Sequence, residues 1–257
     1  MDMVAQNTKG MKKMRDSLAT EKHLNNMINY MREEIEWSKD STSRIIAKKS
    51  EMGEDTSNAM KLGSMDLRAF YVSLINSLYS IGAPMDEINE LFPAVFETFV
   101  GAKESGYADM LWIASIGIML DAPAQMMNEL ARITDENNFS DYLLDFLFCS
   151  IYPKREKQYK EFLFPVPYEF LASVIEAETK DESLHLLQEY LDTLWYKGHK
   201  GEDWYNSHKN MNKSFYDGYW SFESGAIAKI LHLEDTGWEN QKYYPYDMVH
   251  YKNCRTI

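Results

Sequence analysis

The chain has 257 residues, enough for one large domain or two small ones, and 45% of them are hydrophobic, which excludes a disordered chain. Its 12 glycines and 7 prolines make up about 7% of the chain, below the combined share of about 12% that is usual in proteins. This low content disfavours a β-sandwich or a glycine-rich nucleotide fold. Because 40 acidic residues outnumber 27 basic ones, the net charge is −13, and non-specific binding to nucleic acid or to an anionic membrane is disfavoured.

Negative charge is concentrated in the middle of the chain. Residues 1–55 contain ten acidic and ten basic residues, whereas residues 56–150 contain thirteen acidic residues and four basic ones. Residues 151–257 contain seventeen acidic and thirteen basic residues. A surface of this kind suits a positively charged protein partner, but on composition alone a merely solubilising role is the simpler interpretation.

Apolar residues recur at helical spacing along most of the chain. The first predicted helix has a stripe spaced by four, three and four residues: Leu24, Ile28, Met31 and Ile35. A second stripe over residues 67–81 ends at Gly82, a residue type that favours helix C-termini, and Pro84 can open the next helix. Residues 91–99 continue that helix with one apolar residue per turn.

The middle of the chain contains the most apolar predicted helix. Residues 107–120 are apolar on several sides, which predicts a central position. Ser140 is a suitable N-cap for a further helix over residues 143–151, with Asp141 in its first turn.

Prolines and basic residues mark the segment that follows. Pro153, Pro165 and Pro167 interrupt it, and four basic residues fall within seven positions of Pro153. We place a boundary here, between an N-terminal helical region (16–150) and a C-terminal helical region (151–257) that share one core.

The C-terminal region returns to helical spacing. Thr179 and Glu182 form a capping-box pair, and the stripe that follows ends at Gly198. Its members are Leu184, Leu187, Leu191, Leu194 and Trp195. Convincing alternating strands are absent, so the sequence predicts an all-α fold, a compact multi-helix bundle of amphipathic helical hairpins.

Cysteine use and hydropathy indicate a reduced compartment. Cys149 and Cys254 form neither a disulfide framework nor a metal-type pair. The first ten residues are polar and contain no apolar signal segment. The longest apolar run, Leu111–Leu120, has ten residues, whereas a membrane span needs about 20. We expect a cytoplasmic protein that does not interact with membranes.

Histidine spacing gives little support for a metal site. Carboxylate-bridged di-metal bundles need two Glu-x-x-His pairs, but Glu182 with His185 is the only such pair, and Glu182 already serves as a capping residue. A loop site could be formed by His199, Glu202, Asp203 and His208. We interpret these four as solvated loop residues and expect neither a metal nor a cofactor.

Short catalytic motifs are missing from the sequence. It contains no GxxxxGK[ST] phosphate loop, GxGxxG turn, HExxH helix or GxSxG elbow. No serine or cysteine lies in a local arrangement that marks a nucleophile with its base. Catalytic partners can lie far apart in sequence, so this lowers the case for an enzyme without excluding one.

The most unusual stretch is Phe215–Glu223, which reads FYDGYWSFE. On a helix, one face would carry Tyr216, Tyr219, Trp220, Glu223, Ile227, Ile230 and Leu231. Glu223 would then lie among apolar side chains, where a carboxylate must be hydrogen-bonded or protonated. It could be a tuned general acid or a ligand-binding carboxylate. We favour a structural acid that accepts hydrogen bonds from tyrosine hydroxyls or an indole N–H.

Two stretches of the C-terminal region carry a family resemblance. Residues 216–223 (YDGYWSFE) and 243–247 (YYPYD) resemble the C-terminal signature of PoNi-type immunity proteins, the inhibitors of PoNe polymorphic DNase toxins delivered between competing bacteria. Ser224 and Gly225 stand where two alanines are usual in that family. The residues that carry the signature are Tyr216, Gly218, Tyr219, Trp220, Glu223, Tyr244, Pro245 and Asp247. We interpret them as structural residues. The helices predicted between Asp16 and Ser105 resemble the family's N-terminal region.

The resemblance implies a non-catalytic all-α protein that binds and neutralises a cognate nuclease toxin, without a cofactor and without binding nucleic acid itself. A nuclease needs a basic DNA-binding face, and an acidic inhibitor can compete for that face. The candidate contacts are acidic residues on the non-apolar sides of the central helices: Asp86, Glu87, Glu90, Asp109, Asp135, Glu136, Asp141 and Asp145.

Two alternatives remain open at this stage. One is a metal-dependent helical enzyme with a pocket around Glu223, and the other is a general helical adaptor. The sequence leaves the identity of the toxin, the contact surface and the oligomeric state undetermined.

Overall fold

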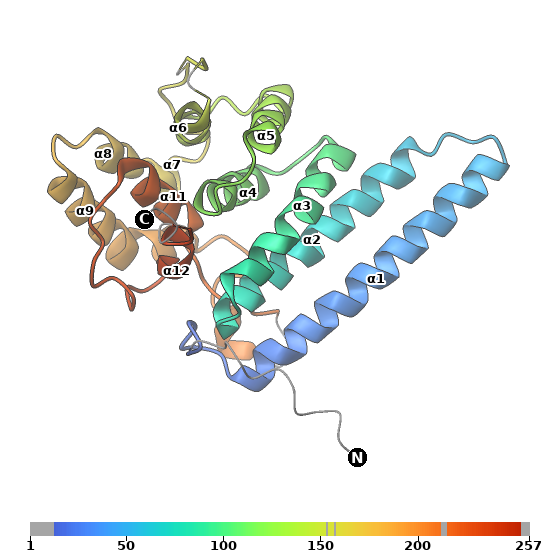
Figure 1. Cartoon of the computed structure of the whole chain (residues 1–257), viewed down its shortest axis with the longest axis horizontal. Helices are drawn as coiled ribbons and strands as arrows, with labels where there is room; N and C mark the ends of the chain where they lie inside the picture. The colour runs from blue at the N-terminus through green and yellow to red at the C-terminus, as the bar shows by residue number, and fades with distance from the viewer. Residues whose placement is uncertain (1–12, 153, 157, 212–214, 253–257) are drawn as a thin grey trace. The chain divides into compact units, whose positions relative to one another are not determined.

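A computed structural model describes residues 13–152, 154–156, 158–211 and 215–252 (Figure 1). The described residues form helices joined by turns and irregular segments, with no β-strand among them. The predicted all-α fold is therefore confirmed. No described helix combines the length and the apolar composition that a bilayer span requires. Cys149 is half-buried, and its thiol donates to the Arg155 carbonyl at 3.4 Å. Cys254 lies outside the described residues.

The chain divides into two compact units. The first contains the described residues up to Ala102 together with those of Asn206–Tyr219, and the second contains Lys103–Tyr205 and the described residues from Trp220 onward. The predicted regions 16–150 and 151–257, with their shared core, stay a prediction.

A long helical hairpin forms most of the first unit. Helix α1 (Glu21–Glu51) and helix α2 (Ser57–Ile81) run antiparallel (Figure 1). The predicted stripe of α1 is confirmed, because Leu24, Ile28, Met31 and Ile35 are all buried. The two helices approach closely at Gly63, where a Cβ atom would lie 2.5 Å from the Thr42 side chain.

Helix α2 ends where the sequence predicts. Gly82 adopts φ = +91°, a left-handed conformation that glycine takes without strain, and it caps the helix. Helix α3 (Met85–Ala102) begins just after Pro84 and runs alongside α2 (Figure 1). The Arg68 guanidinium of α2 lies over the Phe99 ring of α3, 4.6 Å from its centroid.

Residues 206–219, which we call the inserted segment, complete the first unit. They begin with a short 3-10 helix, η2 (Ser207–Asn210), and the described residues 215–219 adopt no regular secondary structure. The Tyr216 carbonyl pairs with His23 Nε2 at 2.8 Å, and the Ser80 hydroxyl donates to the Asp217 carbonyl at 2.7 Å. These contacts attach the inserted segment to the start of α1 and the end of α2.

Helix α4 (Tyr107–Met119) is the core helix of the second unit. It is buried on nearly all sides, as its sequence predicts. It packs against α5 (Ala124–Glu136), α6 (Tyr142–Ile151), α11 (Phe222–Leu231) and α12 (Tyr246–Val249).

Shorter helices complete the second unit. They are α7 (Pro165–Tyr168), α8 (Leu171–Glu176), α9 (Lys180–Glu189), the π-helical turn η1 (Tyr190–Trp195), α10 (Tyr196–Gly198) and α12 (Tyr246–Val249). Half of the predicted capping box is confirmed at α9, where the Thr179 hydroxyl accepts a hydrogen bond from Glu182 N. The Glu182 carboxylate accepts from the Glu178 amide at 3.3 Å, one residue before the N-cap. The helical path that starts there ends at Gly198, as predicted.

Two local predictions are wrong. Asp141, not Ser140, is the N-cap of α6, because its Oδ1 atom accepts hydrogen bonds from the amides of Leu143 and Leu144. Residues 215–221 are not helical, and α11 begins only at Phe222. The predicted helical face from Tyr216 to Leu231 therefore does not exist as one surface.

Candidate functional site

The start of α11 is held by contacts with residues near the end of the described chain. The Ser221 amide donates to the Tyr243 carbonyl at 2.8 Å. A Cβ atom on Gly225 would lie 2.5 Å from Met119 Sδ and 2.6 Å from Pro245 Cγ. The glycine at this position is therefore explained by close packing, since an alanine would require its neighbours to move.

Glu223 is a buried acid with named hydrogen-bond donors. It is 7% exposed, and its Oε1 atom accepts hydrogen bonds from the Ser221 hydroxyl at 2.6 Å and the Tyr190 hydroxyl at 3.3 Å. Burial raises the pKa of Glu223, while the hydrogen bonds from Ser221 and Tyr190 act in the opposite direction. A tyrosine hydroxyl is thus among its donors, as expected from the sequence, and the structural role of Glu223 stays a prediction.

The signature residues Tyr216, Gly218 and Tyr219 belong to the first unit. Tyr216 is buried, and Gly218 adopts φ = +113°, which favours glycine. The Tyr219 hydroxyl lies 2.9 Å from His208 Nδ1 and 3.1 Å from the Ser207 hydroxyl. These contacts join Ser207 and His208, at the start of the inserted segment, to Tyr219 at its end.

Between Tyr216 and Tyr219 the chain carries a second acid, Asp217, which is half-buried. Burial raises the pKa of Asp217 to about 6, although the Ser73 hydroxyl and the Asn76 amide act in the opposite direction by donating to its carboxylate. Asp16, a nearby acid, raises it further. Asp217 is therefore the group of the first unit best suited to a pH test.

The remaining signature residues lie in the second unit. The Tyr244 hydroxyl donates to Asp235 Oδ2 at 2.6 Å, and Asp235 Oδ1 pairs with His250 Nε2 at 2.9 Å. Pro245 is the N-cap of α12, and Asp247 lies in its first turn. Trp220 is half-buried. Sequence reasoning missed Asp235, whose partners lie nine and fifteen residues away.

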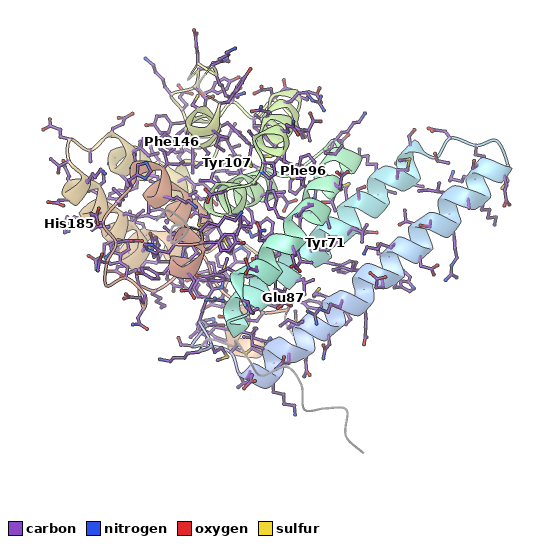
Figure 2. The ribbon with its side chains drawn as sticks, viewed as in Figure 1. Tyr71, Glu87, Phe96, Tyr107, Phe146 and His185 are labelled. Atoms are coloured by element: carbon purple, nitrogen blue, oxygen red, sulfur yellow. The ribbon has the colours of Figure 1, made fainter. Side chains whose placement is uncertain are left out.

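The histidines that the sequence offers as metal ligands do not lie in a cluster of metal-binding side chains within the described residues. Glu182 and His185 are exposed on α9 (Figure 2). His199 is not a solvated loop residue as predicted, because it is buried and its ring contacts the Trp195 carbonyl and the Tyr168 hydroxyl. Across the part of the chain that the structure describes, no three His, Cys, Asp or Glu side chains are grouped to hold a metal ion.

Three of the predicted contact acids lie on α3 in the first unit. Asp86 and Glu90 are exposed. Glu87, labelled in Figure 2, is half-buried. It forms an ion pair with Arg32 of α1, with 2.9 Å between Oε1 and Nη2. Glu97, which was not predicted, is also exposed on this helix. The sequence of α3 contains no basic residue.

The other predicted contact acids are divided between surface and core in the second unit. Asp109 is half-buried in the first turn of α4. Asp135 and Glu136 are exposed at the end of α5, where they form ion pairs with Arg155 and Arg132. Their charges are partly offset by these arginines.

Asp141 and Asp145 cannot form part of an exposed surface. They are 0% and 1% exposed. Asp141 accepts hydrogen bonds from the Tyr107 hydroxyl and from three backbone amides, and Asp145 pairs with Arg155 and accepts the amides of Gln158 and Tyr159. Burial raises the pKa of Asp141, although its amide donors act in the opposite direction. We therefore leave both residues out of any contact surface.

Two models of the same protein family match successive parts of the chain. Residues 15–132 match the family model described as "PoNe immunity protein (PoNi), N-terminal", and residues 139–248 match "PoNe immunity proteins (PoNi), C-terminal". No curated protein matches the chain.

Similarity to solved structures bears on the fold. The crystal structure of protein PA2201 from Pseudomonas aeruginosa is similar with a TM-score of 0.59, at 15% sequence identity, over 96% of this chain and 100% of that chain. At this identity the similarity supports the fold alone. The two family models cover most of the chain, and the chain therefore belongs to the PoNi family of PoNe immunity proteins, which are inhibitors of a nuclease toxin and not enzymes.

Proposed function

We propose that the chain binds its cognate PoNe DNase directly, in the cytoplasm of the cell that makes it, and neutralises it through exposed acidic side chains. The observation that carries this proposal is the match of both PoNi family models. A DNase must attract phosphate groups, so its substrate face is expected to be basic. An acidic inhibitor accelerates encounter with that face and competes with DNA for it.

Helix α3 offers the best-supported acidic surface. Asp86, Glu90 and Glu97 are exposed and follow one another at intervals of four and seven residues. Such intervals place the three carboxylates on one side of the helix. The buried residues, which include Phe92, Val95 and Phe99, occupy the opposite side.

The end of α5 offers a second acidic surface. Glu129, Asp135 and Glu136 are at least partly exposed, and Arg132 pairs with two of them. Because one guanidinium balances two carboxylates there, an excess of negative charge remains. Arg155 offsets the charge of Asp135, so we expect Glu129 and Glu136 to contribute more than Asp135.

Co-expression with the toxin tests the proposal. Cells that express the DNase should survive only when the immunity protein is also made, and the purified proteins should form a complex that weakens as salt increases. A wild-type chain that gives neither protection nor a complex would refute the proposal.

A charge-reversal pair tests the surface. The double variant Glu90→Lys/Glu97→Lys should slow association with the toxin at least tenfold at low salt. The control Glu33→Lys/Glu189→Lys makes the same change of charge at exposed positions of α1 and α9, and its association rate should stay within about threefold of wild type. Equal loss in both variants would mean that only net charge matters and that α3 is not the contact.

A further inference from the structure

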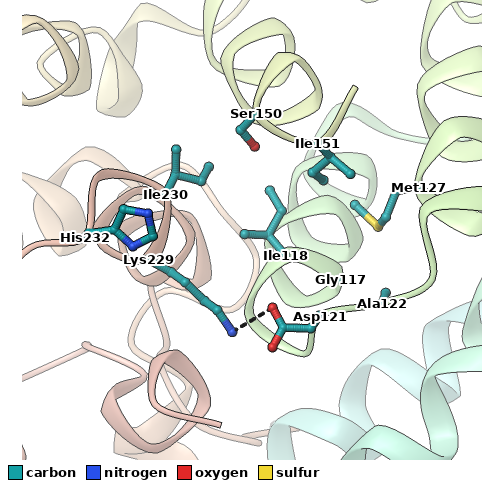
Figure 3. A pocket seen from close by; sticks show the side chains of 10 residues that line it. All are labelled: Gly117, Ile118, Asp121, Ala122, Met127, Ser150, Ile151, Lys229, Ile230 and His232. Atoms are coloured by element: carbon teal, nitrogen blue, oxygen red, sulfur yellow. Dashed lines mark ion pairs between the residues drawn. The ribbon is translucent and has the colours of Figure 1, made fainter. Parts of the chain in front are cut away.

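A cavity of about 400 Å³ lies in the second unit, at a point where three helices end (Figure 3). Gly117 and Ile118 come from the last turn of α4, and Ser150 and Ile151 from the last turn of α6. The end of α11 supplies Ile230 and its C-cap, His232. The fold therefore directs three helix C-termini to one cavity.

Helix C-termini attract positive charge. Each carries the equivalent of roughly half a negative charge, from carbonyl groups that have no partner within the helix. Helices α4, α6 and α11 have 13, 10 and 10 residues, long enough for this effect. The cavity is thus a favourable place for a cation.

Two of the three ends already have a lysine of the same chain. At α4, Lys229 Nζ donates to the Met119 carbonyl at 2.7 Å and pairs with Asp121 Oδ1 at 3.1 Å (Figure 3). At α11, Lys180 Nζ donates to the His232 carbonyl at 3.0 Å. A second lysine, Lys252, donates to the carbonyl of Leu120, the C-cap of α4, at 3.1 Å. None of these lysine contacts is with the end of α6.

The end of α6 has no such lysine. Its last turn contains no basic residue, and no described residue donates a hydrogen bond to the carbonyl groups of Ser150 or Ile151. Asp121 stands at the same cavity with its side chain 50% exposed and only Oδ1 engaged by Lys229. Residues that carry carbonyl and carboxylate acceptors therefore line the same cavity.

The rest of the lining is apolar. Ile118, Met127 and Ile151 line the cavity beside these acceptors. A long cationic side chain buries its aliphatic stem on such a surface while its charged head reaches polar groups. An arginine fits better than a lysine, because its planar group offers five N–H donors to several acceptors at once.

We propose that this cavity receives an arginine side chain of the toxin. The guanidinium would bind the carbonyl groups at the end of α6 and the Asp121 carboxylate, and its stem would lie on Ile118 and Ile151. The inference rests on the proposed function, which supplies a cationic protein partner. It adds an anchoring pocket to a recognition that otherwise depends on surface charge, in the way that interfaces concentrate binding energy in a few buried side chains.

A substitution that fills the cavity from within tests the proposal. Ser150 is exposed in the last turn of α6, so Ser150→Arg places a guanidinium at the site while suiting the helix dipole. It should weaken toxin binding at least tenfold without lowering the melting temperature. Asp121→Asn, which keeps a residue tolerant of the φ of +53° found there, should weaken binding several-fold.

The matched control is Ser173→Arg, which adds the same charge at an exposed position of α8 and should bind toxin within about twofold of wild type. If Ser150→Arg binds as tightly as Ser173→Arg, the pocket proposal is wrong while the proposed function stands.

A toxin-free measurement separates the two proposals. N-acetyl-arginine methylamide, added to the full chain, should shift the backbone amide NMR signals of Asp121 and Ile151, and Ser150→Arg should abolish those shifts. If wild type fails to bind the toxin, the proposed function falls, and this titration decides whether the cavity takes a guanidinium. Absence of shifts in wild type would then overturn the pocket as well.

Discussion

Arg155 links a buried carboxylate to an exposed one. Its Nε atom lies 3.2 Å from Oδ1 of Asp145, and its Nη2 atom lies 2.7 Å from Oδ1 of Asp135. The arginine and Asp145 side chains are 11% and 0% exposed. The arginine thus compensates the charge of a carboxylate that has no access to water, which makes it a stability determinant of the second unit.

Loss of this arginine should destabilise the protein strongly. Arg155→Met leaves Asp145 with its backbone amide donors but without its cation, and breaking a buried pair from one side costs about 3 kcal/mol. The control Arg132→Met removes an arginine that is 48% exposed, where ion pairs contribute about 1 kcal/mol or less. Urea unfolding monitored by circular dichroism compares the two. Equal losses would show that Asp145 does not depend on Arg155.

Substitutions of Glu223 should separate hydrogen bonding from charge. Glu223→Leu leaves the Tyr190 hydroxyl without its acceptor and should cost about 1–3 kcal/mol. Glu223→Gln should cost much less, because the amide oxygen can still accept from Ser221 and Tyr190. Melting curves of the two variants test this, and an unchanged curve for Glu223→Leu would contradict the burial of the site.

The inserted segment should respond to pH through Asp217. Its folded-state pKa is about 6, above the ordinary value of 3.8, so between these values the folded state binds more protons than the unfolded state. The contribution of Asp217 to stability is therefore most favourable below pH 3.8, falls as the pH rises, and levels off above about pH 6.

The variant Asp217→Asn should remove this dependence. Relative to wild type it should gain on the order of 1 kcal/mol of unfolding free energy between pH 4 and pH 7.5. Denaturant unfolding at the two pH values gives the comparison. A constant difference between the variant and wild type would mean that the Asp217 carboxylate titrates as it does in water.

Packing at Gly225 should not tolerate a methyl group. Gly225→Ala forces Met119 or Pro245 to move and should cost about 1–3 kcal/mol despite the better helix propensity of alanine. Gly201→Ala is the control, since nothing lies within 4 Å of a Cβ atom there. Calorimetry of both variants should show a lower melting temperature for Gly225→Ala alone; a melting temperature at or above that of wild type would mean that the close contacts relax without cost.

Local patterns in the sequence were sufficient where the determinants are close in the chain. The buried stripe of α1, the end of α2 at Gly82 and the capping pair of Thr179 and Glu182 all depend on residues within one or two helical turns. The all-α class follows from the sum of such patterns.

Long-range partners account for what the sequence did not reveal. Residues 215–221 have helical spacing, yet they form no helix and pair with distant groups such as His23, Ser80 and Tyr243. Asp145 looked like a surface acid because its cation, Arg155, lies beyond the end of α6 in a stretch that resembles a linker. The cavity was missed for the same reason, since it is lined by the ends of helices far apart in sequence.

The path of residues 206–219 makes the two family regions interdependent. The chain leaves the second unit after Tyr205, completes the first unit, and returns at Trp220. A fragment cut near residue 150 would leave Ser73, Asn76 and Ser80 without the residues that satisfy them. A chimaera that joins the N-terminal region of one relative to the C-terminal region of another would therefore replace the residues that pack inside the first unit, together with any recognition surface. The sequences of the two regions must for this reason change together.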